Sequence, residues 1–134
     1  MITAIEAAEK VRSKLITGGL KTSVSLTGSI YPANRHLNSI KEDIVVSALS
    51  LNGDQVQEGL MNVNIHVPSI SSASDGTQPN LPRFNAIAVA AITLLDDKWD
   101  YDFNIEVEEP GQIYRDKDNS WFCNIRVRFY SPRD

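Results

Sequence analysis

Apolar and polar residues alternate strictly in one stretch near the middle of the chain. Every second position there is apolar: Met61, Val63, Ile65 and Val67. The positions between them are polar: Asn62, Asn64 and His66. Such a strand buries one face and leaves the other to water, so we predict a strand over residues 55–67. Residues 42–51 are predicted to form the preceding strand, and Asn52-Gly53 favours a type I′ turn that joins the two as a hairpin.

The same alternation returns in two stretches near the C-terminus, residues 101–108 and 121–130. The polar positions of the first stretch include two acids: Glu106 and Glu108. The polar positions of the second include two arginines: Arg126 and Arg128. If the two strands pair, these acids and arginines face each other on the exposed side of the sheet. Each such pair contributes about 0.2 to 1 kcal/mol.

Apolar residues at helical spacing predict two helices, over residues 3–17 and 81–96. Thr3 and Glu6 form a capping box at the start of the first helix. Its apolar residues recur every three or four positions: Ile5, Ala8, Val11 and Leu15. The second helix begins after the N-cap Asn80 and carries a broad apolar stripe: Phe84, Ile87, Ala88, Ala91, Leu94 and Leu95. We expect this stripe to lie on the sheet and cover the core.

Residues 24–31 are predicted to form a short extended strand that Pro32 closes. The other segments are predicted to be irregular. Residues 69–80 are rich in Ser, Gly and Pro, which favours an exposed, mobile loop. Residues 110–120 are predicted to form a long connection in which 112–114 could add a brief strand. The elements together predict one α+β domain over residues 1–134. It has one mainly antiparallel sheet of four to five strands, including the 42–51/55–67 hairpin, covered on one face by the helices 3–17 and 81–96.

Composition and charge bear on location and on surface character. Of the 134 residues, 42% are hydrophobic and 22% are charged, which is typical of a soluble globular protein. The chain has no apolar run of membrane-spanning length and no signal-peptide pattern, so we expect it in the cytoplasm of the cell that makes it. The net charge of −4 is unevenly spread, because residues 96–118 carry nine acids and three bases. This segment is either a solvated acidic region or one of two complementary patches for head-to-tail association.

Few residues suggest catalysis or cofactor binding. Cys123 lies at an apolar position of its strand, which predicts a buried, unreactive thiol. His36 and His66 have no third ligand at a recognisable spacing, so we expect no metal site. No phosphate-binding motif occurs, and Arg126, Arg128 and Tyr130 opposite an acidic strand are a weak signal for nucleic acid. We therefore expect a protein that is not an enzyme, uses no cofactor and does not recognise nucleic acid or membranes.

Five segments, in their order along the chain, carry a resemblance to a known family. They are GSIYP (28–32), EDIVVSAL (42–49), MNVNIHVP (61–68), RFNAIAVAAITLL (83–95) and WFCNIRVRFY (121–130). Following an N-terminal helix that ends in glycine, this series resembles the tail-completion, or tail-terminator-like, proteins of long-tailed bacteriophages and prophages. The chain departs from that pattern in a longer loop at 69–80, and in Glu42-Asp43 where a proline and an aromatic residue are expected.

The resemblance implies a non-enzymatic structural protein of virion assembly. Such a subunit forms a homo-oligomeric ring, commonly six-fold, that caps the tail tube, stops its growth and joins it to the head. The implied partners are other copies of the chain, the tail-tube protein and the head-connector protein. The implied location is the virion tail, assembled in the cytoplasm of the bacterial host. Two alternatives remain open: another head-tail connector or neck protein, and a small enzyme or ligand-binding domain.

The polar positions of the strands supply the candidate interface residues. They are Asn62, Asn64, His66, Arg126, Arg128, Glu106 and Glu108. Because their apolar neighbours face the helices, we expect these side chains on the opposite face of the sheet. We interpret that face as a wet contact between subunits or as the wall of a lumen.

Overall fold

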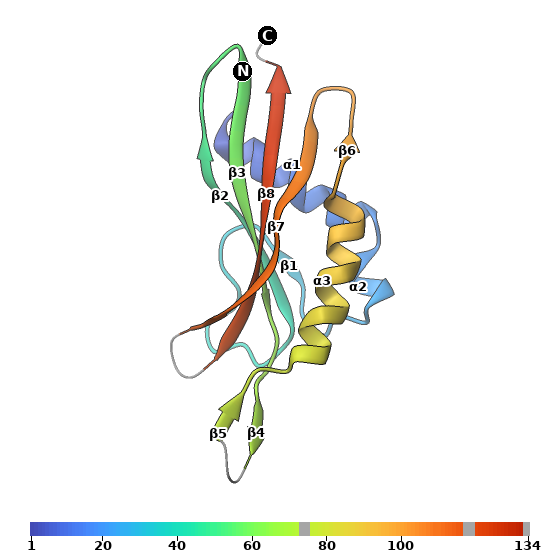
Figure 1. Cartoon of the computed structure of the whole chain (residues 1–134), viewed down its shortest axis with the longest axis vertical. Helices are drawn as coiled ribbons and strands as arrows, with labels where there is room; N and C mark the ends of the chain where they lie inside the picture. Colours follow the sequence, from blue (N-terminus) through green and yellow to red (C-terminus); the bar gives the residue numbers. More distant parts are fainter. Residues whose placement is uncertain (73–75, 117–119, 133–134) are drawn as a thin grey trace.

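The computed structural model describes residues 1–72, 76–116 and 120–132. The described residues form three helices: α1 (Ala4–Thr17), α2 (Leu20–Ser23) and α3 (Leu81–Leu95). The strands are β1 (Ile30–Tyr31), β2 (Asp43–Leu51), β3 (Val56–His66), β4 (Ile70–Ser72), β5 (Gly76–Gln78), β6 (Lys98–Trp99), β7 (Asn104–Arg115) and β8 (Trp121–Pro132). Figure 1 shows α1 and α3 beside a long, strongly twisted sheet.

The main sheet corrects the predicted fold class. Its order is β1-β2-β3-β8-β7-β6, and β1 runs parallel to β2 while every other neighbouring pair is antiparallel. The described part of the chain therefore forms a mixed, curled sheet of six strands with three helices. The prediction of a mainly antiparallel sheet of four to five strands under two helices was wrong. β1 is the end of the short strand that was predicted over residues 24–31. β6 and α2 span only two to four residues, which is too short to show a hydrophobic period.

The hairpin of β2 and β3 is confirmed, but its turn differs from the prediction. The two strands pair from Asp43↔His66 to Leu51↔Gly59. Neither Asn52 nor Gly53 has the positive φ that a type I′ turn requires. Instead, the Asn52 side-chain oxygen accepts hydrogen bonds from the backbone amide of Asp54 at 3.3 Å and from that of Glu58 at 3.0 Å. The asparagine therefore organises a longer loop through its side chain.

The predicted mobile loop over residues 69–80 contains a second, separate sheet. β4 and β5 pair antiparallel, with Ile70 opposite Gln78. Figure 1 shows this β4–β5 hairpin projecting from the end of the molecule, away from the main sheet. The loop prediction was therefore wrong for 70–72 and 76–78, while 73–75 lie outside the described residues. A composition rich in Ser and Gly concealed two strands of three residues each.

β7 extends through most of the segment that was predicted to be a connection. It runs to Arg115 and includes the brief strand expected at 112–114. Its register against β8 is irregular between Val107 and Glu109 and again between Pro110 and Gln112. Gly111, at φ 109°, supplies a backbone conformation that other residues rarely adopt. These irregularities break the alternation of polar and apolar positions. The alternation in the sequence therefore ended at residue 108 and did not predict the rest of β7.

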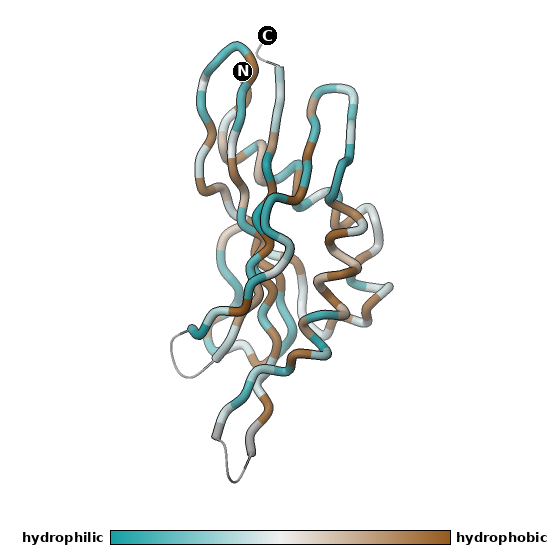
Figure 2. The backbone as a smooth tube through the Cα atoms, in the orientation of Figure 1, coloured by the Kyte–Doolittle hydropathy of each residue, from teal (hydrophilic) through white to brown (hydrophobic). Residues whose placement is uncertain are grey.

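The core lies between the two longer helices and one face of the sheet. α1 contributes Ala7, Ala8, Val11 and Leu15, and α3 contributes Phe84, Ile87, Ala88, Ala91 and Leu95. The central strands add Met61, Val63, Ile65, Ile125, Val127 and Phe129. In Figure 2 the hydrophobic positions recur along α3 and the central strands. Both predicted helices are confirmed, although Ile5 is exposed and Leu94 is half-buried.

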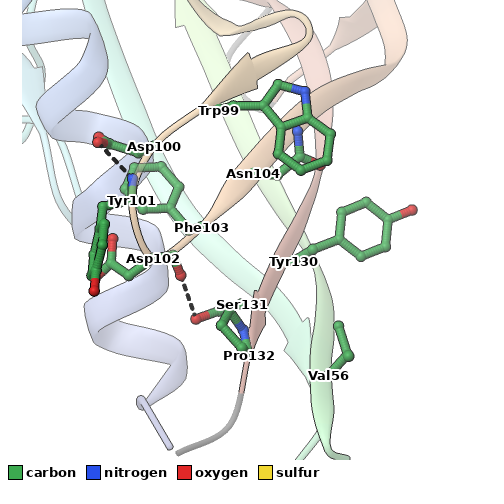
Figure 3. A pocket seen from close by; sticks show the side chains of 10 residues that line it. All are labelled: Val56, Trp99, Asp100, Tyr101, Asp102, Phe103, Asn104, Tyr130, Ser131 and Pro132. Atoms are coloured by element: carbon green, nitrogen blue, oxygen red, sulfur yellow. Dashed lines mark hydrogen bonds between the residues drawn. The ribbon is translucent and has the colours of Figure 1, made fainter.

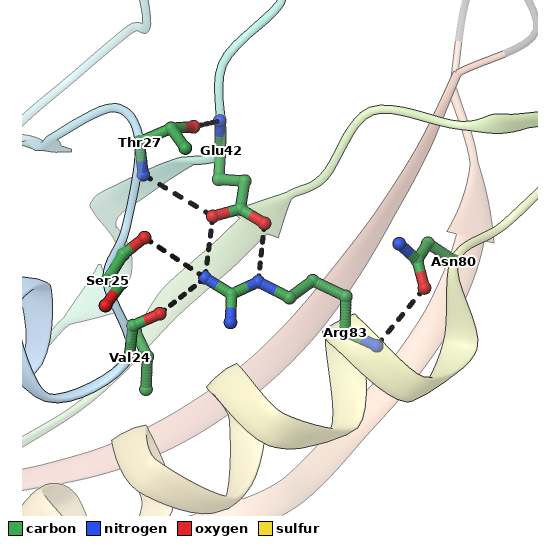
Figure 4. Close-up of polar contacts among 6 residues, drawn as sticks. All are labelled: Val24, Ser25, Thr27, Glu42, Asn80 and Arg83. Atoms are coloured by element: carbon green, nitrogen blue, oxygen red, sulfur yellow. Dashed lines mark hydrogen bonds and ion pairs between the residues drawn. The ribbon is translucent and has the colours of Figure 1, made fainter.

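An ion pair fastens the beginning of α3 to the beginning of β2 (Figure 4). The Arg83 guanidinium donates to both carboxylate oxygens of Glu42, at 2.5 and 2.7 Å, and to the Val24 carbonyl oxygen at 2.5 Å. Glu42 also accepts a bond from the backbone amide of Thr27, at 3.4 Å. The hydrogen bonds from Arg83 lower the pKa of Glu42 below its usual value. Three segments distant in sequence therefore meet at one charge pair.

Removing apolar volume from the buried face of α3 should destabilise the domain. Ile87 is fully buried, so Ile87→Ala should lower the free energy of unfolding by about 2 to 5 kcal/mol. Val89, on the exposed side of the same helix, is the matched control, and Val89→Ala should change stability by less than about 1 kcal/mol. Urea unfolding monitored by circular dichroism measures both. Equal losses in the two variants would contradict the assigned orientation of α3.

Removing Arg83 should leave the buried Glu42 carboxylate without its main partner. Arg83→Met should therefore cost about 2 kcal/mol or more at neutral pH. Because the folded-state pKa of Glu42 lies below its ordinary value of 4.5, the pair stabilises above that pH and the contribution is lost as pH falls further. The difference in unfolding free energy between wild type and variant should therefore shrink in acid.

The matched control is Arg126→Met, which removes a more exposed pair at 3.5 Å and should cost less than about 1 kcal/mol. If the loss of unfolding free energy in Arg83→Met stays constant from neutral to acidic pH, the charge of the Glu42 carboxylate is not the cause of that loss.

Candidate functional site

The face of the main sheet opposite the helices carries the predicted interface residues. We call it the outer face. β3 contributes Asn62, Asn64 and His66, and β8 contributes Phe122, Asn124, Arg126 and Arg128. β7 adds Glu106, Glu108, Glu109 and Tyr114. The apolar side chains that alternate with the β3 set, from Met61 to Ile65, are buried in the core. The structure therefore brings all seven predicted residues onto one surface.

A cluster of amides lies at the centre of the outer face. The Asn124 side-chain nitrogen donates to the side-chain oxygen of Asn64 at 2.7 Å and to that of Asn62 at 3.2 Å. Asn124 is buried, and its own side-chain oxygen has no hydrogen-bond partner among the described residues. Sequence reasoning missed Asn124 as a site residue, because its place beside β3 depends on a strand pairing that the alternation does not specify.

The arginines of the outer face are matched by acids. Arg128 forms hydrogen-bonded ion pairs with Glu58 of β3 and Glu108 of β7. Arg126 lies 3.5 Å from Glu109. The predicted contact between these strands is confirmed for Glu108. The bulge after Val107, however, places Glu109 rather than Glu108 opposite Arg126.

Glu106 takes a different partner from the one predicted. It lies opposite Arg128 in the strand register, but its carboxylate accepts a hydrogen bond from the Tyr130 hydroxyl at 3.2 Å. Burial, followed by the nearby Glu106 carboxylate, raises the pKa of Tyr130. The acids of β7 thus satisfy hydrogen-bond donors of β8 and do not form an isolated acid pair.

A row of rings crosses the sheet beyond the amide cluster. The ring centroids of Tyr114 and Phe122 are 5.5 Å apart, and those of Phe122 and His66 are 5.8 Å apart. Burial, followed by the positive charge of Arg35, lowers the pKa of His66 to about 4, although Asp116 and Asp43 act in the opposite direction. His66 is therefore neutral at pH 7. Around His66, Phe122 and Tyr114, the outer face therefore offers hydrogen-bonding groups and aromatic surface, and none of these three side chains is charged.

The other candidate residues behave as structural groups. Cys123 is buried on the core side of β8, as predicted, and burial raises the pKa of its thiol to about 11. No group of three His, Cys, Asp or Glu side chains in the described ranges is arranged to hold a metal ion. His36 packs edge-on against Tyr31, with ring centroids 5.4 Å apart. Among the helices of the described segments, none has the length and apolar character to cross a membrane.

A pocket of about 520 Å³ lies away from the outer-face cluster, where β6, β7 and the end of β8 meet (Figure 3). Its apolar lining is formed by Val56, Trp99, Tyr101, Phe103, Tyr130 and Pro132. We call it the β6–β7 pocket. Figure 3 shows the Trp99 and Tyr130 rings among the side chains that line it. Sequence reasoning missed this site, although Trp99 and Tyr101, two large aromatic residues in a strongly acidic segment, were a usable signal.

Comparison with known proteins found no family model and no curated protein that matches the chain. The geometry of the described residues is therefore the basis for a functional proposal. It offers a broad polar sheet face with a neutral histidine, and a separate apolar pocket at one edge of the sheet.

His66 should make the stability of the domain depend on pH. Its folded-state pKa of about 4 lies below the ordinary value of 6.5, so between these values the unfolded chain binds a proton that the folded protein does not. Stability should consequently fall as pH decreases from about 6.5 to about 4. In His66→Gln, the free energy of unfolding from urea titrations should decline less over this range. Parallel pH profiles of wild type and variant would contradict the burial of a neutral imidazole.

Proposed function

We propose that this chain is a non-enzymatic assembly subunit, a tail-completion protein of a long-tailed phage or prophage. In this proposal, copies of the chain form a ring that closes the end of the tail tube and joins it to the head connector. The finished ring lies in the virion tail, after assembly in the host cytoplasm. The order of elements that underlies the sequence resemblance supports this proposal, and so does the distribution of uncovered surface.

The observation that carries the proposal is the pair of unlike, largely unpaired edges of the main sheet. At one edge, β1 pairs with β2 only at Ile44 and Val45, so residues 46–51 have no strand on that side in the described structure. At the other edge, β6 pairs only with Asn104 and Ile105 of β7. Free edges are sites for association between chains. Two different edges suit a head-to-tail contact, which closes into a ring when the rotation between copies allows it.

The two edges differ in their capacity to pair. Residues 46–51 of β2 contain no charged residue and no proline, although their pairing with β3 is irregular between Ala48 and Ser50. This edge is therefore less protected against a further strand than the edge of β7. The edge of β7 carries acids, Pro110 and two register irregularities, which protect it against simple strand addition. Contact between unlike edges therefore relies partly on side chains.

The outer face supports assembly in another way. Its arginines are neutralised within the same molecule, and its centre consists of half-buried amides beside a neutral histidine. Such a surface can exchange hydrogen bonds with a neighbouring protein directly or through water, without leaving a charge unpaired. This character suits a wet subunit contact or a lumen wall.

The oligomeric state tests the proposal directly. Native mass spectrometry and light scattering at several concentrations, with and without tail-tube protein, should reveal a closed ring of defined subunit number. A chain that stays monomeric under all these conditions would contradict the proposal. A dimer as the largest species would also contradict it, because it would indicate pairing of two identical β2 edges.

Charge introduced into the free edge of β2 should block assembly and leave folding intact. Leu49 is exposed at this edge, and Leu49→Lys should shift the population from ring to monomer. Val89→Lys, which adds the same charge to an exposed position of α3, should assemble like the wild type. Sedimentation velocity measures the distribution, and thermal unfolding should show both variants folded. Full assembly of Leu49→Lys would exclude this edge from the contact.

A further inference from the structure

Exposed apolar side chains occur at opposite edges of the main sheet. Two of them lie on the otherwise polar loop of residues 33–41, which joins β1 to β2 at the first edge. Others line the β6–β7 pocket, which includes Trp99 of β6 at the last edge. A head-to-tail contact brings opposite edges of neighbouring copies together.

The 33–41 loop presents two aliphatic side chains to solvent. Leu37 is 91% exposed and Ile40 is 85% exposed. An exposed Leu or Ile is common by itself, but two of them within four residues of one short loop offer apolar surface to a partner. Their burial in a complex would remove this apolar surface from water.

Hydrogen bonds order the loop that carries Leu37 and Ile40. The Arg35 guanidinium donates to the Ser39 carbonyl oxygen at 3.0 Å and to the Lys41 carbonyl oxygen at 2.9 Å. Its Nε also lies 3.0 Å from the Asp43 carboxylate, which accepts a further bond from the Ser39 hydroxyl at 2.6 Å. Asn38 adopts a left-handed conformation, with φ of 56°. A loop ordered before binding loses less conformational entropy when it docks.

The β6–β7 pocket has a complementary surface. Trp99 is 75% exposed and Tyr101 is fully exposed, so each leaves a ring uncovered beside the pocket. The Trp99 indole nitrogen donates to the Asp97 carboxylate at 3.2 Å, and the Phe103 ring stacks on Phe129 with centroids 5.5 Å apart. The volume of about 520 Å³ lies within the size range of binding pockets, and exposed rings at such a site are typical of binding anchors.

The charges around the two surfaces are of opposite sign. Residues 96–102 contain four aspartates and one lysine, whereas residues 33–41 contain two cationic side chains and no acid. Asp100 and Asp102 are each 3.2 Å from a lysine of α1, and Arg35 is paired with Asp43. Beyond these internal pairs, the pocket side retains excess negative charge and the loop side retains Lys41. This complementarity favours the unlike contact over contact between two pockets or two loops.

We propose that Leu37 and Ile40 of one copy insert into the β6–β7 pocket of the next copy. The occupant is thus a second copy of this chain, held by burial of the aliphatic side chains against Trp99 and Tyr101. This inference rests on the self-association in the proposed function and specifies the surfaces that meet.

Mixing of two complementary variants tests the contact. Leu37→Asp/Ile40→Asp removes the two exposed aliphatic side chains of the loop. Trp99→Ala/Tyr101→Ala removes the exposed aromatic rings of the pocket. Each variant alone should associate about tenfold more weakly, or worse, than the wild type. A mixture should form a dimer of one copy of each, because the intact pocket of the first variant receives the intact loop of the second. Analytical ultracentrifugation measures these species, and circular dichroism checks that both variants are folded.

Disulfide trapping provides a second readout that does not depend on weakened binding. Leu37→Cys and Trp99→Cys, mixed as separate proteins under mild oxidation, should form the mixed disulfide dimer as the main product. Ile5→Cys, an equally exposed aliphatic position on α1, is the matched control and should not cross-link efficiently to Trp99→Cys. The buried native thiol of Cys123 should contribute little background.

The outcomes separate this inference from the broader proposal. If the wild type forms a ring and both double variants assemble equally well, the loop-to-pocket contact is wrong while the ring proposal stands. Cross-linking of Ile5→Cys as efficient as that of Leu37→Cys would likewise overturn the contact. If the wild type remains monomeric even with tail-tube protein, both the contact and the ring proposal fail.

Discussion

The pairing of β3 with β8 is the constraint on which the rest of the structure depends. It joins eleven residue pairs, from Val56↔Pro132 to His66↔Phe122, whose members are 56 to 76 positions apart in sequence. It occupies the centre of the sheet and connects the β2–β3 hairpin to the C-terminal strands. A shift of one residue would exchange the two faces, moving Asn62 toward the core and Met61 toward water. The cost of burying amides and exposing apolar side chains therefore holds the register.

That register also determines which surfaces remain available. One face of the sheet is covered by α1 and α3, with Arg83 and Glu42 tying α3 to β2 and to the segment that precedes it. The other face satisfies most of its charges internally. The two edges of the sheet are also uncovered, because β1 and β6 are too short to pair with the full length of their neighbours. A loop with two exposed aliphatic side chains and an apolar pocket occur at these edges, which is a physical basis for association between copies.

Local patterns predicted the elements whose residues carry a clear period. The apolar stripes identified α1 and α3, and strict alternation identified β3, β8 and the face on which Asn62, Asn64 and His66 lie. The same reasoning failed for β6, α2, β4 and β5, because two to four residues do not establish a period, and it placed β1 only within a longer segment, 24–31. It also misjudged the turn at Asn52, where a side-chain hydrogen bond replaced the backbone geometry that Asn-Gly favours. In β7, bulges and Gly111 interrupted the alternation and concealed half of the strand.

The sequence by itself determined most of the residues that are buried along α1, α3, β3 and β8, because burial there follows the period of polar and apolar positions. It thereby determined the separation of a core face from an outer face and the burial of Cys123. Only the tertiary structure decided which strands are neighbours. The approach of Asn124 to Asn62 and Asn64, the pairing of Arg128 with Glu58, and the meeting of Val56 with Trp99 at one pocket all depend on that order. Strand order results from packing and loop closure over the whole chain, and the alternation within a single strand carries no information about its neighbour.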